Sequence, residues 1–151
     1  MTAMTEQAIE QLVVGADLAR CYDVLLDFEQ YPQWAPDIKE ARVLARDDEG
    51  RGTRVAFRAA AMGRSASYVL EYDYFSVPEA LSWRLVEGDI MRGLDGEYRF
   101  APSGDGGTEI TYRLSVDLVV PIPGFVKRRA EGKIMSTALR ELRRRVESLT
   151  V

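Results

Sequence analysis

The feature that most constrains the fold of this chain is a succession of strand-like segments separated by short turns. Six such segments follow residue 38, and glycine, proline or aspartate residues close most of them. They are KEARVLARD (39–47), TRVAFRAAA (53–61), SASYVLEYDYFS (65–76), LSWRLVEG (81–88), DGEYRFAPSG (95–104) and TEITYRLSVDLVV (108–120). The last segment alternates most cleanly, with Ile110, Tyr112 and Leu114 on one face and Thr111 and Arg113 on the other. Successive strands with short turns predict an antiparallel meander.

The chain before the meander predicts one further strand and two short helices. Residues 7–14 form the expected strand, and Asp17 is placed to cap a helix over residues 18–28, where apolar residues recur at spacings of three and four. Two prolines bracket the following stretch, YPQWAPDI. Because proline breaks longer helices, we expect only a short helical turn there.

The chain closes with a long amphipathic helix, expected over residues 124–149. Its apolar stripe is Met135, Leu139, Leu142, Val146 and Leu149. A seven-stranded antiparallel sheet with one apolar face needs a cover, and this helix is the only predicted element long enough to provide it. We therefore predict an α+β fold in one domain over residues 1–151. Its curved seven-stranded sheet wraps around the C-terminal helix, with the two short helices after the first strand.

A curled sheet that grips a cylinder leaves space between them, and the alternation of each strand identifies the lining of that space. The residues predicted to face it from the sheet are Val55, Phe57, Tyr68, Leu70, Tyr72, Trp83, Leu85, Tyr98, Phe100, Tyr112 and Leu114. Ile134 and Ala138 would face it from the helix, where Ala130 and Gly132 also remove volume. A glycine inside a helix costs about 1 kcal/mol relative to alanine. Gly132 therefore either keeps an entrance or a bend open, or is a tolerated surface glycine.

This lining would be aromatic and aliphatic, with tyrosine hydroxyls as its main polar groups. Such a wall suits an apolar or polyaromatic small molecule that a few hydrogen bonds orient. The alternative is that these side chains pack solidly against one another. Trp34, on the proline-bracketed turn, would line or close the space, or else would plug the core.

The amino-acid composition excludes several classes of catalysis and metal binding. The chain has no histidine and a single cysteine, Cys21. This excludes Ser-His-Asp and Cys-His catalysis, and it gives no ground to predict a metal or a cofactor. Asp95 and Glu97 could form a carboxylate pair, but the tyrosine that follows is in the opposite phase and takes the inner face. Arg64 and Arg84 could anchor an anionic head group, although solvent is the predicted environment of both.

Positive charge is concentrated near the C-terminus. Residues 123–151 carry eight basic and three acidic side chains, a net charge of +5 in a chain whose total is −4. Such a helix could meet an anionic membrane or nucleic acid, but we predict a solvated face. No aromatic residue lies among the arginines to stack on bases. No apolar run approaches the ~20 residues of a membrane span, and the first residues lack a signal-like stretch. A cytoplasmic protein is therefore expected, with a homodimer left open.

Several motifs resemble those of a known superfamily over residues 7–149. YPQWAPDI, LSWRLVEGD, GDGGTEITYRLSVDLVVPIPGFVKRR and the closing amphipathic helix look like the START-related helix-grip (SRPBCC, Bet v 1-like) superfamily. They are most similar to bacterial polyketide cyclase/dehydrase and lipid-transport-type proteins. The resemblance implies a deep cavity between the sheet and the long helix, closed by loops near its mouth, but the fold carries binding, transport and catalysis alike.

Catalytic members of the superfamily offer a comparison. Aromatase/cyclases are thought to use an arginine, a tyrosine and an asparagine, and the matching positions here hold Tyr72, Ile38 and Leu139. The missing cation counts against a cyclase, which must stabilise enolate charge. Three functions stay open: a binding or carrier protein for a lipid, quinone or polyketide-like compound, a cyclase/aromatase or dehydratase acting through Tyr72 and Tyr68, and a ribosome- or protein-interaction module.

Overall fold

The computed structural model describes residues 8–61, 64–120 and 122–148. Its elements, in chain order, are β1 (Ala8–Val14), α1 (Leu18–Leu26), the single 3-10 turn η1 (Phe28–Gln30), α2 (Tyr31–Trp34), β2 (Ile38–Arg46), β3 (Gly52–Ala61), β4 (Arg64–Asp73), β5 (Ala80–Gly88), β6 (Met91–Pro102), β7 (Thr108–Leu118) and α3 (Gly124–Ser148). The predicted order of a strand, short helices, six strands and a long helix is confirmed. Gln7 and Leu149, which we expected in the first strand and the last helix, lie outside the described residues.

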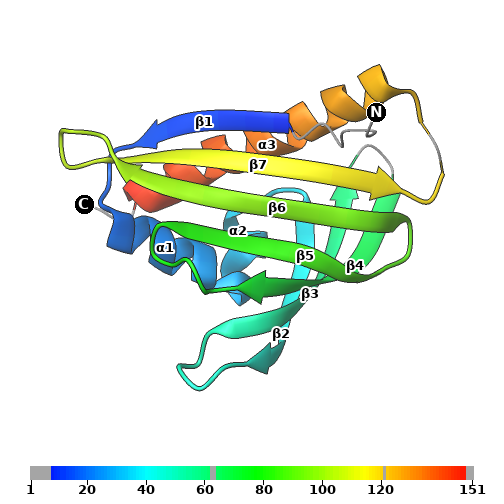
Figure 1. Cartoon of the computed structure of the whole chain (residues 1–151), viewed down its shortest axis with the longest axis horizontal. Helices are drawn as coiled ribbons and strands as arrows, with labels where there is room; N and C mark the ends of the chain where they lie inside the picture. Colours follow the sequence, from blue (N-terminus) through cyan, green and yellow to red (C-terminus); the bar gives the residue numbers. More distant parts are fainter. Residues whose placement is uncertain (1–7, 62–63, 121, 149–151) are drawn as a thin grey trace.

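The seven strands form one antiparallel sheet in the order β1-β7-β6-β5-β4-β3-β2 (Figure 1). Strands β2 to β7 are the predicted meander, in which every strand pairs with its neighbour in sequence. The first strand joins the last, so that Ile9 lies opposite Arg113. The helices between β1 and β2 therefore carry the chain from one edge of the sheet to the other.

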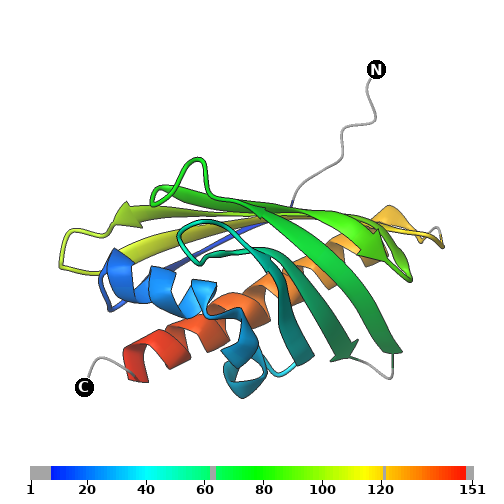
Figure 2. The same ribbon diagram turned by 90° about the horizontal axis from the view of Figure 1, so that it is seen from below.

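All three helices lie on the same side of the curved sheet (Figure 2). Asp17 caps α1 as predicted, because its carboxylate accepts a hydrogen bond from the backbone N–H of Arg20 at 3.1 Å. This helix ends at Leu26, two residues earlier than expected, and the buried Phe28 opens the 3-10 turn instead. The predicted helical turn around the prolines is α2.

The two largest differences from the predicted strand boundaries are at the end of β4 and the start of β6. Strand β4 ends at Asp73 rather than at residue 76, because the Asp73 carboxylate accepts a hydrogen bond from the Phe75 N–H at 2.8 Å and turns the chain. Strand β6 begins at Met91, four residues earlier than predicted, and pairs there with the end of β7. Both differences move turns without changing which face each inner aromatic residue occupies.

The C-terminal helix packs most tightly along its second half. The buried members of its apolar stripe are Met135, Leu139, Leu142 and Val146. Its last turn is joined to the turn between β1 and α1, since Glu147 Oε2 accepts a hydrogen bond from the Gly15 N–H at 2.8 Å. Across the described ranges, no helix is both long and apolar enough to cross a bilayer. The first half of α3 carries smaller side chains toward the sheet, and a cavity lies there.

Candidate ligand cavity

A cavity of about 390 Å³ lies between the inner face of the sheet, the first half of α3 and the segment that joins α2 to β2. Eleven of the residues singled out from the sequence lie on its wall. They are Trp34, Phe57, Tyr68, Leu70, Tyr72, Trp83, Tyr98, Tyr112, Leu114, Ile134 and Ala138. The alternative offered from the sequence was that these side chains fill the space solidly. The cavity shows that the space between the sheet and the first half of α3 is not filled.

Three residues predicted to face the space do not line the cavity. Val55 is fully buried in the core, opposite Leu70 in the β3–β4 pair. Phe100 is buried in the core beyond Tyr98. Leu85 is half-buried beside a register shift in which the β4–β5 pairing skips a residue of β5, which interrupts the simple alternation.

The centre of the wall is a cluster of aromatic rings around Trp83. The ring centroids of Tyr98, Tyr72 and Tyr112 lie 5.1, 5.7 and 5.8 Å from that of Trp83. Gly96 is the partner of Trp83 across the β5–β6 pair, and a Cβ at this position would overlap the indole. The absence of a side chain on β6 therefore lets the indole lie across its neighbouring strand.

A second aromatic group borders the cavity near α2. Tyr31 is held in place because its hydroxyl donates a hydrogen bond to the Leu25 carbonyl at 2.6 Å. The half-buried Trp34 packs on it, with ring centroids 5.0 Å apart. Phe57 stacks on Tyr68 from the sheet, with centroids 5.6 Å apart. Trp34 thus stands on the cavity wall, and its role as a lid over a ligand stays a prediction.

The tyrosine hydroxyls of the wall are held in their neutral form. Burial raises the pKa of Tyr72, Tyr98 and Tyr112 well above the ordinary value near 10, and it also raises the pKa of Tyr68. The rings of Tyr98 and Tyr112 lie side by side, with centroids 4.6 Å apart. These groups can donate hydrogen bonds to a bound molecule, but they are poor bases at neutral pH.

Small and aliphatic residues form most of the helix side of the wall, together with Lys127 and Glu131. Ala130, Ile134, Thr137 and Ala138 line the cavity from α3. Gly132 does not, and a Cβ there would meet nothing within 4 Å. Of the two explanations offered for this glycine, the structure favours the tolerated surface position.

One wall residue that sequence reasoning missed is Glu131. Its side chain is 1% exposed and lines the cavity. Oε2 accepts a hydrogen bond from the Val116 N–H at 2.8 Å, whereas Oε1 has no hydrogen-bond partner among the described residues. The helical spacing indicated that Glu131 is buried, because it precedes Met135 by four residues and so continues the buried stripe of α3 by one turn.

The remaining charged candidates lie at the mouth or outside the cavity. Arg64, which we expected in solvent, is exposed but also borders the cavity at the start of β4. Arg84 faces away and pairs with Glu71. On β6, Asp95 is exposed and Glu97 pairs with an arginine of the same strand at 2.7 Å, so this carboxylate pair does not reach the cavity.

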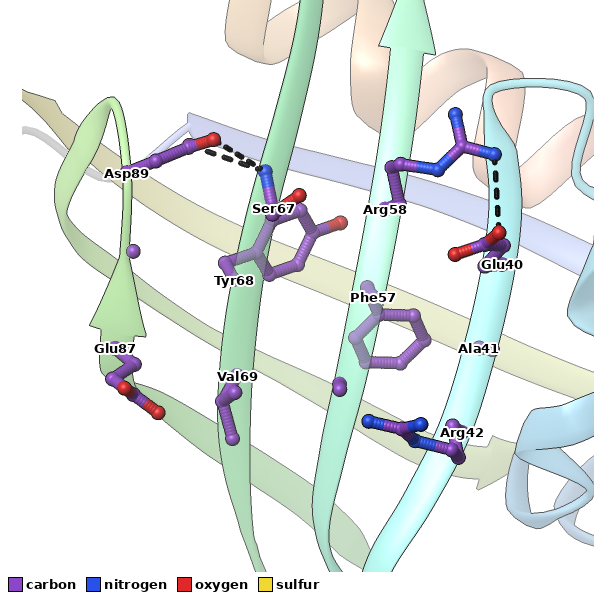
Figure 3. Close-up of a pocket in the computed structure, with 12 residues that line it drawn as sticks. Glu40, Ala41, Arg42, Phe57, Arg58, Ser67, Tyr68, Val69, Glu87 and Asp89 are labelled. Carbon is purple, nitrogen blue, oxygen red and sulfur yellow. Dashed lines mark hydrogen bonds and ion pairs between the residues drawn. The ribbon is translucent and has the colours of Figure 1, made fainter.

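A wider hollow of about 790 Å³ lies against the opposite face of the sheet, over β2 to β5 (Figure 3). About half of its lining residues are polar or charged side chains that alternate with the inner aromatic ones, such as Glu40, Arg58 and Glu87. Arg58 pairs with Glu40 at 3.4 Å, and both Asp89 carboxylate oxygens lie 3.1 Å from the Ser67 N–H. These groups satisfy one another at an open surface, so the smaller inner cavity is the better candidate site.

The sequence matches a known family over almost its whole length. A family model described as polyketide cyclase / dehydrase and lipid transport matches residues 6–147. No curated protein is similar enough in sequence to count as a match.

Solved structures share the fold closely. A START superfamily protein from Mycobacterium smegmatis is 26% identical, with a TM-score of 0.89, over 95% of this chain and 99% of that chain. A protein from Thermus thermophilus is 24% identical, with a TM-score of 0.80, over 97% of this chain and 100% of that chain. The Zhui aromatase/cyclase from a Streptomyces species is 14% identical, with a TM-score of 0.80, over 94% of this chain and 93% of that chain.

Proposed function

Since the chain belongs to the polyketide cyclase / dehydrase and lipid transport family, we propose that its inner cavity binds one apolar small molecule. The expected ligand is a lipid, a quinone or a polyketide-like compound. The protein would act as a carrier or a receptor for it. This proposal also assigns ligand contact to the wall residues that the sequence identified, from Trp34 on α2 to Ala138 on α3.

The observation that supports the proposal most is the chemistry of the wall. Aromatic rings and aliphatic side chains surround the space, and four neutral tyrosines supply a few oriented polar groups. This is the usual composition of a small-molecule site, and the volume falls within the range of about 300 to 1,000 Å³ that such sites occupy. The charged residues Arg64 and Lys127 are half-buried or exposed members of the wall, so they would meet the polar end of a ligand.

Native mass spectrometry of the purified protein tests this function. We expect a species heavier than the chain that releases an apolar compound on denaturation and extraction. An Ala138→Phe variant, which fills the cavity from α3, should lose that species. An Ala19→Phe variant, at an exposed position of α1, should keep it. A wild-type protein that also fails to take up any added lipid, quinone or polyaromatic compound would refute the proposal.

An enzymatic role as a cyclase/aromatase or dehydratase is the second candidate, and the hydroxyls of Tyr68 and Tyr72 favour it. Neutral tyrosines on the wall could polarise a ketone carbonyl, which is a form of electrostatic catalysis. Two of the positions matched to catalytic residues elsewhere, Tyr72 and Ile38, border the cavity, while Leu139 is buried in the core. Turnover of a poly-β-ketone thioester surrogate, lost in Tyr72→Phe, would establish this function.

The interaction-module reading and the homodimer stay predictions. On α3, Arg144 pairs with Glu141 at 3.5 Å, and Arg145 donates a hydrogen bond to Gln33 at 3.1 Å. These contacts support a solvated face rather than a nucleic-acid surface. Salt-sensitive binding to RNA or ribosomes, abolished by charge reversal at residues 143–145, would show the opposite. Sedimentation equilibrium would measure the oligomeric state.

A further inference from the structure

We propose that Glu131 determines specificity within the cavity by accepting a hydrogen bond from a donor group of the ligand. The ligand would then carry an O–H or N–H group, and hydroxylated apolar molecules would be favoured over ethers and carboxylates. This inference rests on the proposed binding function. It adds the chemistry of the ligand's polar end.

The Glu131 carboxyl group has unmet hydrogen-bonding capacity. Glu131 is 1% exposed, and only Oε2 has a partner, the Val116 N–H at 2.8 Å. Oε1 has none among the described residues. A buried acceptor without a partner is costly, and hydrogen bonds to charged groups contribute more than those between neutral ones. A ligand donor in the cavity would supply the missing bond.

The Glu131 carboxyl group lies on the part of the wall where α3 meets the end of β7. Within the described residues, β1 begins at Ala8 opposite Leu114, so it does not reach Val116 on β7. Glu131 contacts the sheet at this uncovered edge. Val116 and Leu118 from β7 and Leu94 from β6 also line the cavity, and Lys127 lies one helical turn before Glu131 on the same wall. The carboxyl group is therefore an acceptor on the α3 side of a mostly apolar wall.

The hydrogen-bonding character of Glu131 differs from that of the tyrosine cluster. Tyr98 and Tyr112 are neutral and can donate hydrogen bonds, whereas Oε1 of Glu131 is an oxygen without a donor partner among the described residues. Val116 lies four residues beyond Tyr112, which is ~13 Å along an extended strand. The wall thus offers donors in one part and an acceptor in another. A ligand with a carbonyl or ether oxygen at one end and a hydroxyl at the other would satisfy both.

A purely structural role is the competing explanation for Glu131. In that case the residue only caps the Val116 N–H, and a substitution would change stability without changing which ligands bind. The two roles separate when the measured quantity is a ratio of affinities for matched ligands. Loss of stability alone does not move such a ratio.

The test measures the binding of naphthol, methoxynaphthalene and naphthoate, all substituted at the same ring position, by isothermal titration calorimetry. We expect the wild type to bind naphthol at least tenfold more tightly than either analogue. In Glu131→Gln, the amide oxygen can accept from Val116, and the NH2 group then puts a donor in place of the acceptor Oε1. The preference for naphthol over the methyl ether should then fall below about threefold, in keeping with the loss of one hydrogen bond.

The matched control is Glu141→Gln, on the same helix but outside the cavity, which should keep the wild-type ratio. If Glu131→Gln does not fold, as judged by circular dichroism, Glu131→Asp withdraws the carboxylate by one methylene and should also lower the ratio. Equal wild-type affinities, or a preference that persists in the folded Glu131 variant, would overturn this inference and leave the binding function standing. If none of these probes nor any lipid or quinone binds the wild type, the proposed function fails, and this inference with it.

Discussion

Gly96 and Trp83 show how a single residue can shape the cavity wall. The indole lies where a Cβ on Gly96 would be, so Gly96→Ala should force the ring or the strand to move. Overpacking of this kind costs about 1 to 3 kcal/mol. We expect urea denaturation to show a loss of that size in the free energy of unfolding.

The control for this change is Gly132→Ala. The added methyl group meets nothing within 4 Å, and alanine favours the helix by up to about 1 kcal/mol. This variant should therefore be more stable than the wild type. The account of both positions would be contradicted if the two substitutions shifted the free energy of unfolding in the same direction.

The tyrosines predict a characteristic response to alkaline pH. All seven have a pKa raised in the folded chain, chiefly by burial. Below pH ~10 both the folded and the unfolded chain keep these protons, so the tyrosines leave stability unchanged. Above pH ~10 the unfolded chain releases protons that the folded chain retains, and stability should fall as the pH rises further.

Absorbance of tyrosinate checks this directly. At pH 10 the folded protein should show little tyrosinate, while the same protein unfolded in guanidinium chloride should show about half ionisation. Similar spectra for the two states would mean that the cavity tyrosines are not shielded from solvent.

At the scale of the element, the first helix depends on its cap. Removing the Asp17 carboxylate leaves the Arg20 N–H without its acceptor, and the loss of an N-cap typically costs about 1 kcal/mol. We expect this destabilisation in Asp17→Ala by urea denaturation. Asp23→Ala, at an exposed position within the same helix, should change stability much less. Equal losses of stability in the two variants would show that the Asp17 cap does not stabilise α1.

The elements were predictable from the sequence because their signals are local. Alternation and turn residues placed six strands, and the spacing of apolar residues placed α1 and α3. The pairing of β1 with β7 was not predictable in the same way, because alternation does not say which strand a segment joins. The end of β4 at Asp73 depends on one side-chain hydrogen bond that competes with the strand.

At the scale of the whole molecule, the cavity was predictable in outline and less so in detail. The alternation of side chains along each strand identified most of the wall residues. It failed for Leu85, which lies beside a register shift, and for Val55, which is fully buried in the core. Glu131 was missed because a charged residue on a helix is normally assigned to solvent. Its position on the buried stripe overrides that expectation, and only the packing of α3 on β7 shows it.

The most direct test of the cavity uses the chain's own fluorescence. Both tryptophans, Trp34 and Trp83, line the cavity. Titration with the apolar fluorophore phenylnaphthylamine should therefore quench their emission saturably. The account predicts that the quenching is lost in Ala138→Phe and kept in Ala19→Phe. Quenching that never saturates, or that survives unchanged when Ala138 is replaced by phenylalanine, would contradict a ligand site between the sheet and α3.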